Sequence, residues 1–383
     1  KEKIFPVLEK PPPFYPTIPF FRPIGKYLTF VKRMIIMLDY GDLLDFVDLP
    51  CGGRFVYTRL FCNRFRADPE NAIRRTLGRK SRAALFSGKR FRKPAAEDIS
   101  FVSDKGQTLR GCIYSDMRVK EPKGLVIWVH GFGAGHNAYT TEIAYLAAQG
   151  YLVLGYDNTG CVLSDGKGVG GLIQGAIDAS YAVRYVQNEP RLKQYKRVLV
   201  GHSWGAYSAM NIFSFGEHVD GVVAMCGFDT AQGVVTDMSS RYFGGFSGLI
   251  RFYSKILHRL RFGRLASVSS RKSLLKSDVP VLLLYGEDDK VVPFRTNGRK
   301  IIRAVRDKKN IRAITYPDKG HSVYLTIKAE KYIKEVFAKL ASSKKMPSEE
   351  FERYRSSIDY ALLTEEDAAV MGEIRDFLEN IFC

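Results

Sequence analysis

The sequence predicts an α/β fold with a mostly parallel central sheet, helices on both of its faces, a cap insertion, and helical extensions at both ends. Two observations lead to this prediction. Apolar runs of strand length alternate with helical segments from about residue 98 to residue 340, and such alternation is typical of parallel sheets. Several of these runs lead directly into turns that carry serine, aspartate or histidine.

The chain divides into four predicted regions. Residues 1–97 form an N-terminal extension with a proline-aromatic arm (11–23), which cannot be helical, and helices near 25–44 and 71–86. The core comprises 98–229 and 276–340, the cap insertion spans 230–275, and an acidic helical tail spans 345–383.

Smaller elements are expected within these regions. Residues 99–102 and 108–114 pair as a hairpin at the start of the core. In the cap insertion, the glycine-rich residues 244–248 predict a mobile segment, and 249–257 predict an amphipathic helix. In the tail, residues 364–367 predict the N-cap of a helix that runs to Phe382.

Gly201-His202-Ser203-Trp204-Gly205 carries the strongest chemical signal in the chain. It reads Gly-x-Ser-x-Gly and directly follows the apolar run 197–200, which predicts a sharp strand-to-helix turn that exposes a nucleophilic serine. The helix expected after it aims its N-terminal N–H groups at the position where an oxyanion would form. A structural turn serine is the alternative for the motif alone.

A glycine-rich loop follows an earlier apolar run, 124–129. It reads His130-Gly131-Phe132-Gly133-Ala134-Gly135-His136, and its glycines alternate, so the dinucleotide pattern Gly-x-Gly-x-x-Gly does not fit. The N–H groups of Phe132 and Trp204 are predicted to form the oxyanion hole. The alternatives are a plain turn or a phosphate cradle.

An acid and a histidine follow the last two predicted strands. The run 279–285 leads into Glu287-Asp288-Asp289, and the run 311–316 leads into Gly320-His321. A carboxylate past a strand end can orient an imidazole, which takes the proton of Ser203. Asp288 and Asp229, which lies just beyond the predicted strand 222–226, compete with Asp289 for this role.

Taken together, these motifs resemble an α/β-hydrolase of the monoacylglycerol lipase and lysophospholipase type, a group that shades into serine aminopeptidases. The resemblance covers roughly residues 98–340, and it implies the α/β-hydrolase fold with a Ser203, Asp289 and His321 triad in that chain order. It selects Asp289 as the third residue after Gly286, and it places the oxyanion donors at Phe132 and Trp204. One run departs from the family pattern Asp-x-Arg-Gly-x-Gly-x-Ser: Thr159 and Val162 replace the arginine and the second glycine, which alters a pocket wall rather than the triad.

Charge is distributed unevenly over the 383 residues, whose net charge is +19. Residues 64–93 hold eleven lysines and arginines against two acids, residues 241–276 hold nine against none, and the tail from 349 onward holds ten acids against three arginines. One interpretation is peripheral contact between the basic regions and an anionic membrane surface. The other is a solvated basic surface that partly pairs with the acidic tail. No motif supports nucleic-acid binding.

We therefore expect a serine carboxylic-ester hydrolase, an esterase or lipase that acts on small-molecule or lipid-like monoesters and needs no metal or organic cofactor. A peptidase or amidase on the same scaffold is the alternative, but an aminopeptidase would need acidic groups in its cap to bind a substrate amine, and this cap is basic. Acyl transfer to another acceptor, or a scaffold that lost its chemistry, are further alternatives.

The expected location is cytoplasmic, with membrane association as the variant. The chain begins at Lys1 rather than at a methionine, so this expectation leaves room for a preceding signal peptide or anchor. The six cysteines are expected to be mostly free thiols, with a pair between Cys51 and Cys62 as the weaker alternative.

Overall fold

The computed structural model describes residues 94–243, 247–342 and 348–383. The predictions for the proline-aromatic arm, for the helices near 25–44 and 71–86, and for the Cys51–Cys62 pair lie outside these residues, as does most of the segment predicted to be mobile. Four cysteines lie within the described residues, and Cys112, Cys161, Cys226 and Cys383 are free thiols there.

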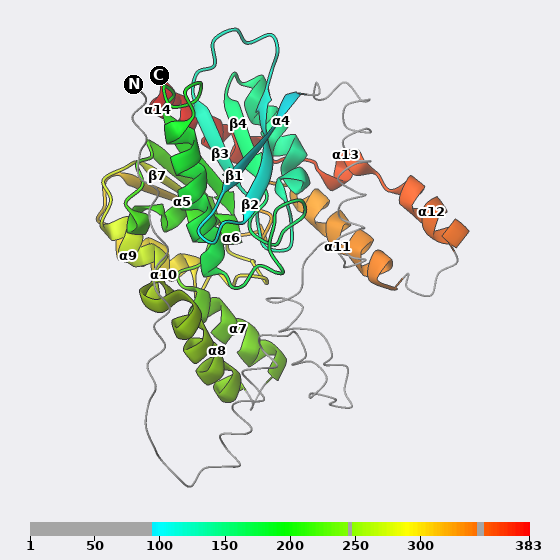
Figure 1. The fold of residues 1–383 in the computed structure, drawn as a ribbon. Coiled ribbons are helices and arrows are strands. Elements are labelled where there is room, and N and C mark those ends of the chain that lie inside the picture. The colour runs from blue at the N-terminus through cyan, green and yellow to red at the C-terminus, as the bar shows by residue number, and fades with distance from the viewer. Residues whose placement is uncertain (1–93, 244–246, 343–347) are drawn as a thin grey trace. The chain divides into compact units, whose positions relative to one another are not determined.

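Eight strands form one sheet in the order β1-β2-β4-β3-β5-β6-β7-β8 (Figure 1). Their bounds are β1 Ala95–Val102, β2 Thr108–Ser115, β3 Leu125–Val129, β4 Leu152–Tyr156, β5 Arg197–His202, β6 Gly221–Met225, β7 Val281–Gly286 and β8 Ile311–Tyr316. β1 and β2 form the predicted antiparallel hairpin, β2 runs antiparallel to β4, and the remaining neighbours are parallel. The predicted fold class is confirmed.

Helices cover both faces of this sheet. One core cluster packs the sheet against α5 (Ile173–Asn188), α6 (Trp204–Met210), α9 (Ser270–Leu275) and α10 (Gly298–Val305). The other packs it against α4 (Thr140–Ala148), α11 (Ile327–Ser342) and α14 (Ala368–Phe382). β3, β6 and β7 are buried along their whole lengths, as expected for strands of a parallel sheet that is covered on both sides.

Among the described residues between β6 and β7, where the sequence predicts the cap insertion, the structure has four helical segments. They are α7 (Ala231–Phe243), α8 (Ser247–Phe262), the 3₁₀ segment Gly263–Ser267 and α9. Figure 1 shows α7 and α8 side by side as a helical pair, and the Ser254 hydroxyl donates to Gln232 Oε1 across them at 3.0 Å. The amphipathic helix predicted for 249–257 is the middle of α8.

The C-terminal segment is helical, as predicted, and its last helix belongs to the main core. α12 (Ser348–Ser357) and the short α13 (Tyr360–Leu363) precede α14. Asp367 is the N-cap of α14, because its carboxylate accepts from the N–H groups of Ala369 and Val370. Among the described residues, no helix has both the length and the apolar composition that membrane crossing requires.

Candidate active site

Ser203 lies at the turn between β5 and α6, and its backbone is strained. Its φ is 57° and its ψ −113°, a combination that non-glycine residues adopt only when the surroundings impose it. The Ser203 N–H donates to Met225 O on the neighbouring β6 at 2.8 Å. A side chain at Gly201 would collide with the Gly205 carbonyl, and one at Gly205 would collide with Val129 O. These contacts explain the two glycines that flank the serine.

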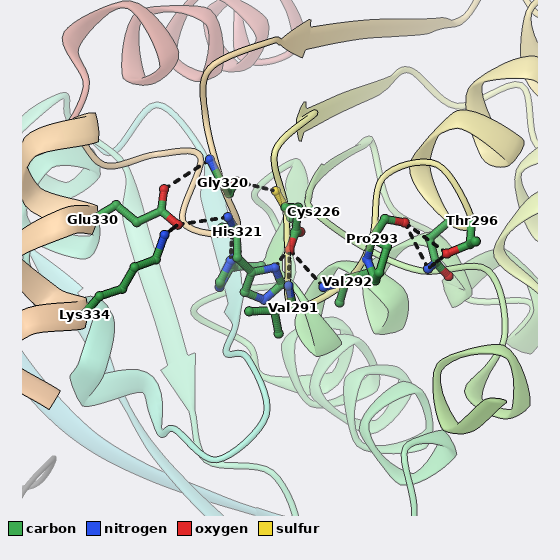
Figure 2. A network of polar contacts seen from close by, with 12 residues as sticks. Cys226, Val291, Val292, Pro293, Thr296, Gly320, His321, Glu330 and Lys334 are labelled. Atoms are coloured by element: carbon green, nitrogen blue, oxygen red, sulfur yellow. Dashed lines mark hydrogen bonds and ion pairs between the residues drawn. The ribbon is translucent and has the colours of Figure 1, made fainter. Parts of the chain in front are cut away.

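Asp289 and His321 form a direct pair at the carboxyl ends of β7 and β8. Asp289 Oδ2 lies 2.7 Å from His321 Nδ1, while Asp289 Oδ1 accepts from the N–H groups of Val291 and Val292, each at 2.8 Å. Figure 2 shows His321, Val291 and Val292 close together. The carboxylate is buried, and the imidazole is mostly buried. Because Nδ1 is held by the carboxylate, Nε2 is the ring nitrogen left for proton transfer.

The two competing acids have other partners. Asp229 accepts from the Ser269 hydroxyl at 2.6 Å and pairs with the Arg271 guanidinium at 2.7 Å. Its carboxylate therefore binds residues at the start of α9. Asp288 is largely exposed and pairs with Lys290. Among the described acidic residues, the structure therefore brings Asp289 to the His321 imidazole and directs Asp229 and Asp288 elsewhere.

A second carboxylate fixes the backbone that carries His321. Glu330, on α11, accepts from Gly320 N–H at 3.1 Å and from His321 N–H at 3.2 Å. Lys334, one turn further along α11, lies 3.3 Å from the same carboxylate. Figure 2 shows Glu330 pointing at these two N–H groups, with Lys334 beside it. Glu330 thus holds the loop without touching the imidazole.

His202, the residue before Ser203, connects three loops. Its Nε2 lies 2.9 Å from His321 O, and its Nδ1 lies 2.9 Å from the Tyr139 hydroxyl, which in turn accepts from Gly131 N–H at 3.0 Å. A carbonyl can only accept, so Nε2 carries the proton and Nδ1 accepts from the tyrosine. Burial, aided by the charge of His321, lowers the pKa of His202 to about 3, which keeps this tautomer neutral.

The loops that carry the two predicted oxyanion donors lie against each other. The rings of Phe132 and Trp204 pack edge to face with centroids 5.4 Å apart. The Trp204 indole N–H donates to Leu172 O at 2.6 Å, and Trp204 is the first residue of α6. His130 Nε2 accepts from Asn158 N–H at 2.9 Å, which ties the start of the glycine-rich loop to the segment after β4.

A buried ion pair holds the other end of this loop. His136 Nδ1 lies 2.8 Å from Asp157 Oδ1, and the His136 backbone N–H donates to the same oxygen at 3.0 Å. Burial opposes the charge on His136, but the adjacent Asp157 carboxylate more than offsets it and raises the pKa of His136 to about 9. The pair therefore stays ionised at neutral pH and fixes the loop that runs from Gly131 to Gly135.

Comparison with known proteins agrees with this architecture. Residues 120–272 match the family model described as Serine aminopeptidase, S33. The fold is similar to that of the Pyrococcus furiosus esterase Pf2001, with a TM-score of 0.51 and 16% sequence identity over 76% of this chain and 92% of that one. The chain therefore has the α/β-hydrolase fold, and residues 120–272, less than half of its length, are similar to the S33 family.

Two curated relatives of this chain differ in coverage. The Bifunctional esterase/perhydrolase DCH of Acinetobacter calcoaceticus is 42% identical over 71 residues, which is 18% of this chain and 24% of that protein. The uncharacterized protein YfhR of Salmonella typhi is 25% identical over 59% of this chain and 74% of its own length. The chain thus spans only about a quarter of the first relative.

The donor atoms of Cys226, Asp289 and His321 all lie within 4.8 Å of one another. Such a set resembles metal ligands, but burial raises the pKa of the Cys226 thiol well above its usual range, and a metal ligand would have to be the thiolate. The Asp289 oxygen nearest the histidine is already engaged with Nδ1. The arrangement therefore fits an acid–imidazole pair better than a metal centre.

Sequence reasoning missed three residues that organise this site. Tyr139 and His202 each contact a loop distant in sequence, and Glu330 contacts the loop before its own helix. His202 was part of the serine motif, but nothing in the motif assigns it a partner. Glu330 and Tyr139 sit in helical segments without a chemical signature, so only the folded arrangement identifies them.

Proposed function

We propose that this α/β-hydrolase is a serine carboxylic-ester hydrolase that acts on lipid-like monoesters through an acyl-enzyme on Ser203. One observation carries the proposal. The Asp289–His321 pair, at 2.7 Å, and the strained Ser203 turn both lie at the carboxyl edge of the parallel strands, which is where α/β folds bind their ligands.

Acylation would follow from the residue types. His321 Nε2 takes the Ser203 hydroxyl proton while Oγ attacks the ester carbonyl carbon, and Asp289 stabilises the resulting imidazolium. The negative charge on the former carbonyl oxygen is met by the N–H groups of Phe132 and Trp204. When the tetrahedral intermediate collapses, the carbon–oxygen bond breaks, and the alcohol leaves with the proton from His321.

Deacylation would repeat these steps with water. His321 takes a proton from the water molecule, whose oxygen attacks the acyl carbon, and the bond to Ser203 Oγ breaks. The serine recovers its proton and the carboxylic acid is released. Each step uses groups of this chain and water, so the proposed reaction is balanced without an additional reactant.

The cap insertion favours an ester over an aminoacyl substrate. Asp237 is the one acidic residue in 230–275, and its carboxylate accepts from the Thr296 hydroxyl at 2.9 Å and from Asn297 Nδ2 at 3.0 Å. An aminopeptidase needs an acidic group to bind the substrate amine, and Asp237 already serves a structural role. This argues against the activity named in the family description and for a neutral or anionic substrate.

Two apolar side chains at the carboxyl edge support a lipid-like substrate. Leu163, after β4, is 55% exposed, and Val291, beside Asp289, is 59% exposed. Apolar side chains at the edge that carries the reactive groups are suited to contact an acyl chain. The names of the Acinetobacter relative and the Pyrococcus structure, both esterases, agree with ester chemistry.

The test is hydrolysis of p-nitrophenyl esters from acetate to palmitate, alongside aminoacyl anilides and with an added alcohol as an alternative acyl acceptor. We expect ester turnover with an optimum at longer chains, and Ser203→Ala should lower kcat by roughly 10⁴-fold or more. Preferential turnover of the anilides would contradict the proposal and support a peptidase. Acyl transfer to the alcohol in preference to water would support an acyltransferase.

The neighbouring aspartates supply a matched pair of variants. Asp289→Asn should lower kcat by about 10³–10⁴-fold, because the imidazole loses the charge that fixes its tautomer. Asp288→Asn removes the same charge one residue away, from a carboxylate that pairs with Lys290, and should leave kcat unchanged. Equal losses in the two variants would contradict the assignment of Asp289.

A further inference from the structure

The outer face of α8 carries a row of exposed apolar side chains. Phe252 is 59% exposed, Ile256 40% and Leu260 72%. These residues are spaced four apart, so they lie above one another on the helix. Large apolar side chains are usually exposed singly, and three in one helical row form a continuous apolar strip, here called the α8 strip.

A row of cations runs beside the α8 strip. Arg251, Lys255 and Arg259 each precede one member of the strip and are exposed, and Arg264 continues the positive charge beyond the helix. Within the part of the chain that the structure describes, none of these four residues forms an ion pair. The outer face of α8 therefore combines uncovered apolar surface with uncompensated positive charge.

The opposite side of α8 is packed on the protein. Ser254, His258 and Phe262 are buried, and a side chain at Gly171 would collide with the Phe262 ring. Gly171 precedes Leu172, whose carbonyl accepts from the Trp204 indole N–H. The inner side of α8 is therefore packed on the core, and the outer side carries the strip. The inner side contacts Gly171, and the next residue, Leu172, is hydrogen-bonded to Trp204 at the start of α6, beside Ser203.

We propose that the outer face of α8 docks on an anionic lipid bilayer, with Phe252, Ile256 and Leu260 in the interfacial region and Arg251, Lys255 and Arg259 at the lipid phosphates. This is the chemistry of an interfacial helix, in which apolar insertion and attraction to anionic lipid act together. The inference stands independently of the catalytic proposal, because binding requires no substrate.

Charge complementarity selects this occupant over the alternatives. Residues 1–93 of the same chain hold 20 lysines and arginines against eight acids, so their charge repels the basic row. A nucleic acid would satisfy the cations but would leave the aliphatic strip without a partner. A bilayer with anionic headgroups offers both negative charge and an apolar phase along one helix length.

The test is flotation of the full chain with vesicles of phosphatidylcholine alone or mixed equally with phosphatidylglycerol. We expect the protein to float with the mixed vesicles and to remain behind with the neutral ones, and added salt should release it. No flotation with the mixed vesicles would overturn the proposal, and so would equal flotation with both kinds.

Two triple variants separate the two rows. Phe252→Gln with Ile256→Gln and Leu260→Gln removes the apolar strip and keeps the charge. Arg251→Gln with Lys255→Gln and Arg259→Gln keeps the strip and removes the cations. Each cation near an anionic surface is worth about a fivefold change in partitioning, so the second variant should bind about 100-fold more weakly. The first should lose at least as much.

The control variant is Lys193→Gln with Lys328→Gln and Lys331→Gln. These lysines are exposed elsewhere on the described surface, so the change in net charge is the same, and partitioning should stay within about threefold. Circular dichroism checks folding in each variant. If either α8 variant floats as well as the unmodified chain, the proposal is wrong. It is also wrong if the chain ignores vesicles but forms a dimer that both α8 variants abolish, which would assign the face to a second copy.

Discussion

At the residue scale, Tyr139 is placed to affect the ester hydrolysis proposed above. Its hydroxyl accepts a hydrogen bond from Gly131 N–H and donates one to His202 Nδ1, and His202 Nε2 donates to the His321 carbonyl. Tyr139→Phe removes the two hydrogen bonds of this hydroxyl, which link the glycine-rich loop to the turn at Ser203 and so to the loop that carries His321. We expect kcat to fall about tenfold with KM unchanged, and the free energy of unfolding to fall by about 1–3 kcal/mol because a buried donor loses its partner.

The measurement is steady-state kinetics beside denaturant unfolding. Tyr332→Phe is the control, since that hydroxyl also accepts from a backbone N–H, that of Asp359 at 3.0 Å, but does so away from the strand ends. A purely structural role for Tyr139 would lower the free energy of unfolding and leave kcat intact, and that outcome would contradict a positioning role.

The His136–Asp157 pair predicts how stability depends on pH. The pKa of His136 rises from 6.5 to about 9 on folding, so the folded state binds a proton that the unfolded state releases within this window. The stabilisation is fully present below pH 6.5 and is lost as pH rises through about 9. Its size is at most about 3 kcal/mol.

The measurement is the free energy of unfolding across that pH window. His136→Gln should be less stable at the acidic end and should lose most of the decline toward alkaline pH. His218→Gln is the control, because that histidine is exposed and lies 3.8 Å from Asp220. An unchanged decline in His136→Gln would show that other groups cause it.

At the element scale, the close approach of α6 to β3 depends on one missing side chain. A Cβ at Gly205 would collide with the Val129 carbonyl, which is backbone and cannot turn away, whereas a Cβ at Gly372 in α14 would meet nothing within 4 Å. Gly205→Ala should therefore lower the free energy of unfolding by at least about 2 kcal/mol. Gly372→Ala should raise it by about 0.5–1 kcal/mol through helix propensity.

Denaturant unfolding of both variants measures the contrast, and ester hydrolysis by Gly205→Ala reports whether the serine turn moves. Both variants make the same chemical change, so a general effect of the added methyl group predicts equal results. If Gly205→Ala proved as stable as the unmodified chain, α6 could shift away from β3 at little cost, and the packing argument would fail.

The sequence predicts the central strands well, because a strand that is buried on both faces is apolar along its length. The run 279–285 overlaps the fully buried β7 but starts two residues before it and ends one residue before its end. The run 311–316 matches the edge strand β8, although none of its residues is fully buried. β1 begins at Ala95, whereas the sequence predicts its start near residue 99. Residues 95–98 are small or acidic, so they give no apolar signal, and they are strand because they pair with β2. Edge pairing of this kind leaves little trace in local composition.

Contacts between loops are harder to predict than the strands. The residues alone could not separate Asp288 from Asp289, which are both acidic and adjacent. In the structure the separation comes from the turn after β7, where two backbone N–H groups converge on Asp289. Glu330 contacts the His321 backbone from the first turn of α11, the helix that follows this loop. Such contacts depend on where the chain returns after folding, and no local pattern encodes them.

At the scale of the whole molecule, α14 contributes to the core that positions the site, although it ends the chain. Leu378 is fully buried in the same cluster as Val200 of β5 and Val223 of β6. Side chains at Gly124 and Gly221 would collide with Phe382 and Ile381, so the helix lies directly on the sheet. The predicted boundary at 345 therefore does not mark the end of the core packing.

This placement predicts that damage to α14 weakens the sheet that carries Ser203. Leu378→Ala should lower the free energy of unfolding by about 2–4 kcal/mol, while Ile327→Ala, at a side chain that is 49% exposed, should cost about 0.5 kcal/mol. The two tryptophans of the chain, Trp128 on β3 and Trp204 on α6, are both buried. Their fluorescence therefore reports on the sheet and not on the tail.

The measurement is denaturant unfolding of Leu378→Ala, followed by tryptophan fluorescence and by ester hydrolysis. The native fluorescence and the hydrolysis should disappear together, at a lower denaturant concentration than in the unmodified chain. A fluorescence transition at its original midpoint would mean that α14 unfolds on its own, and the activity would then be independent of it.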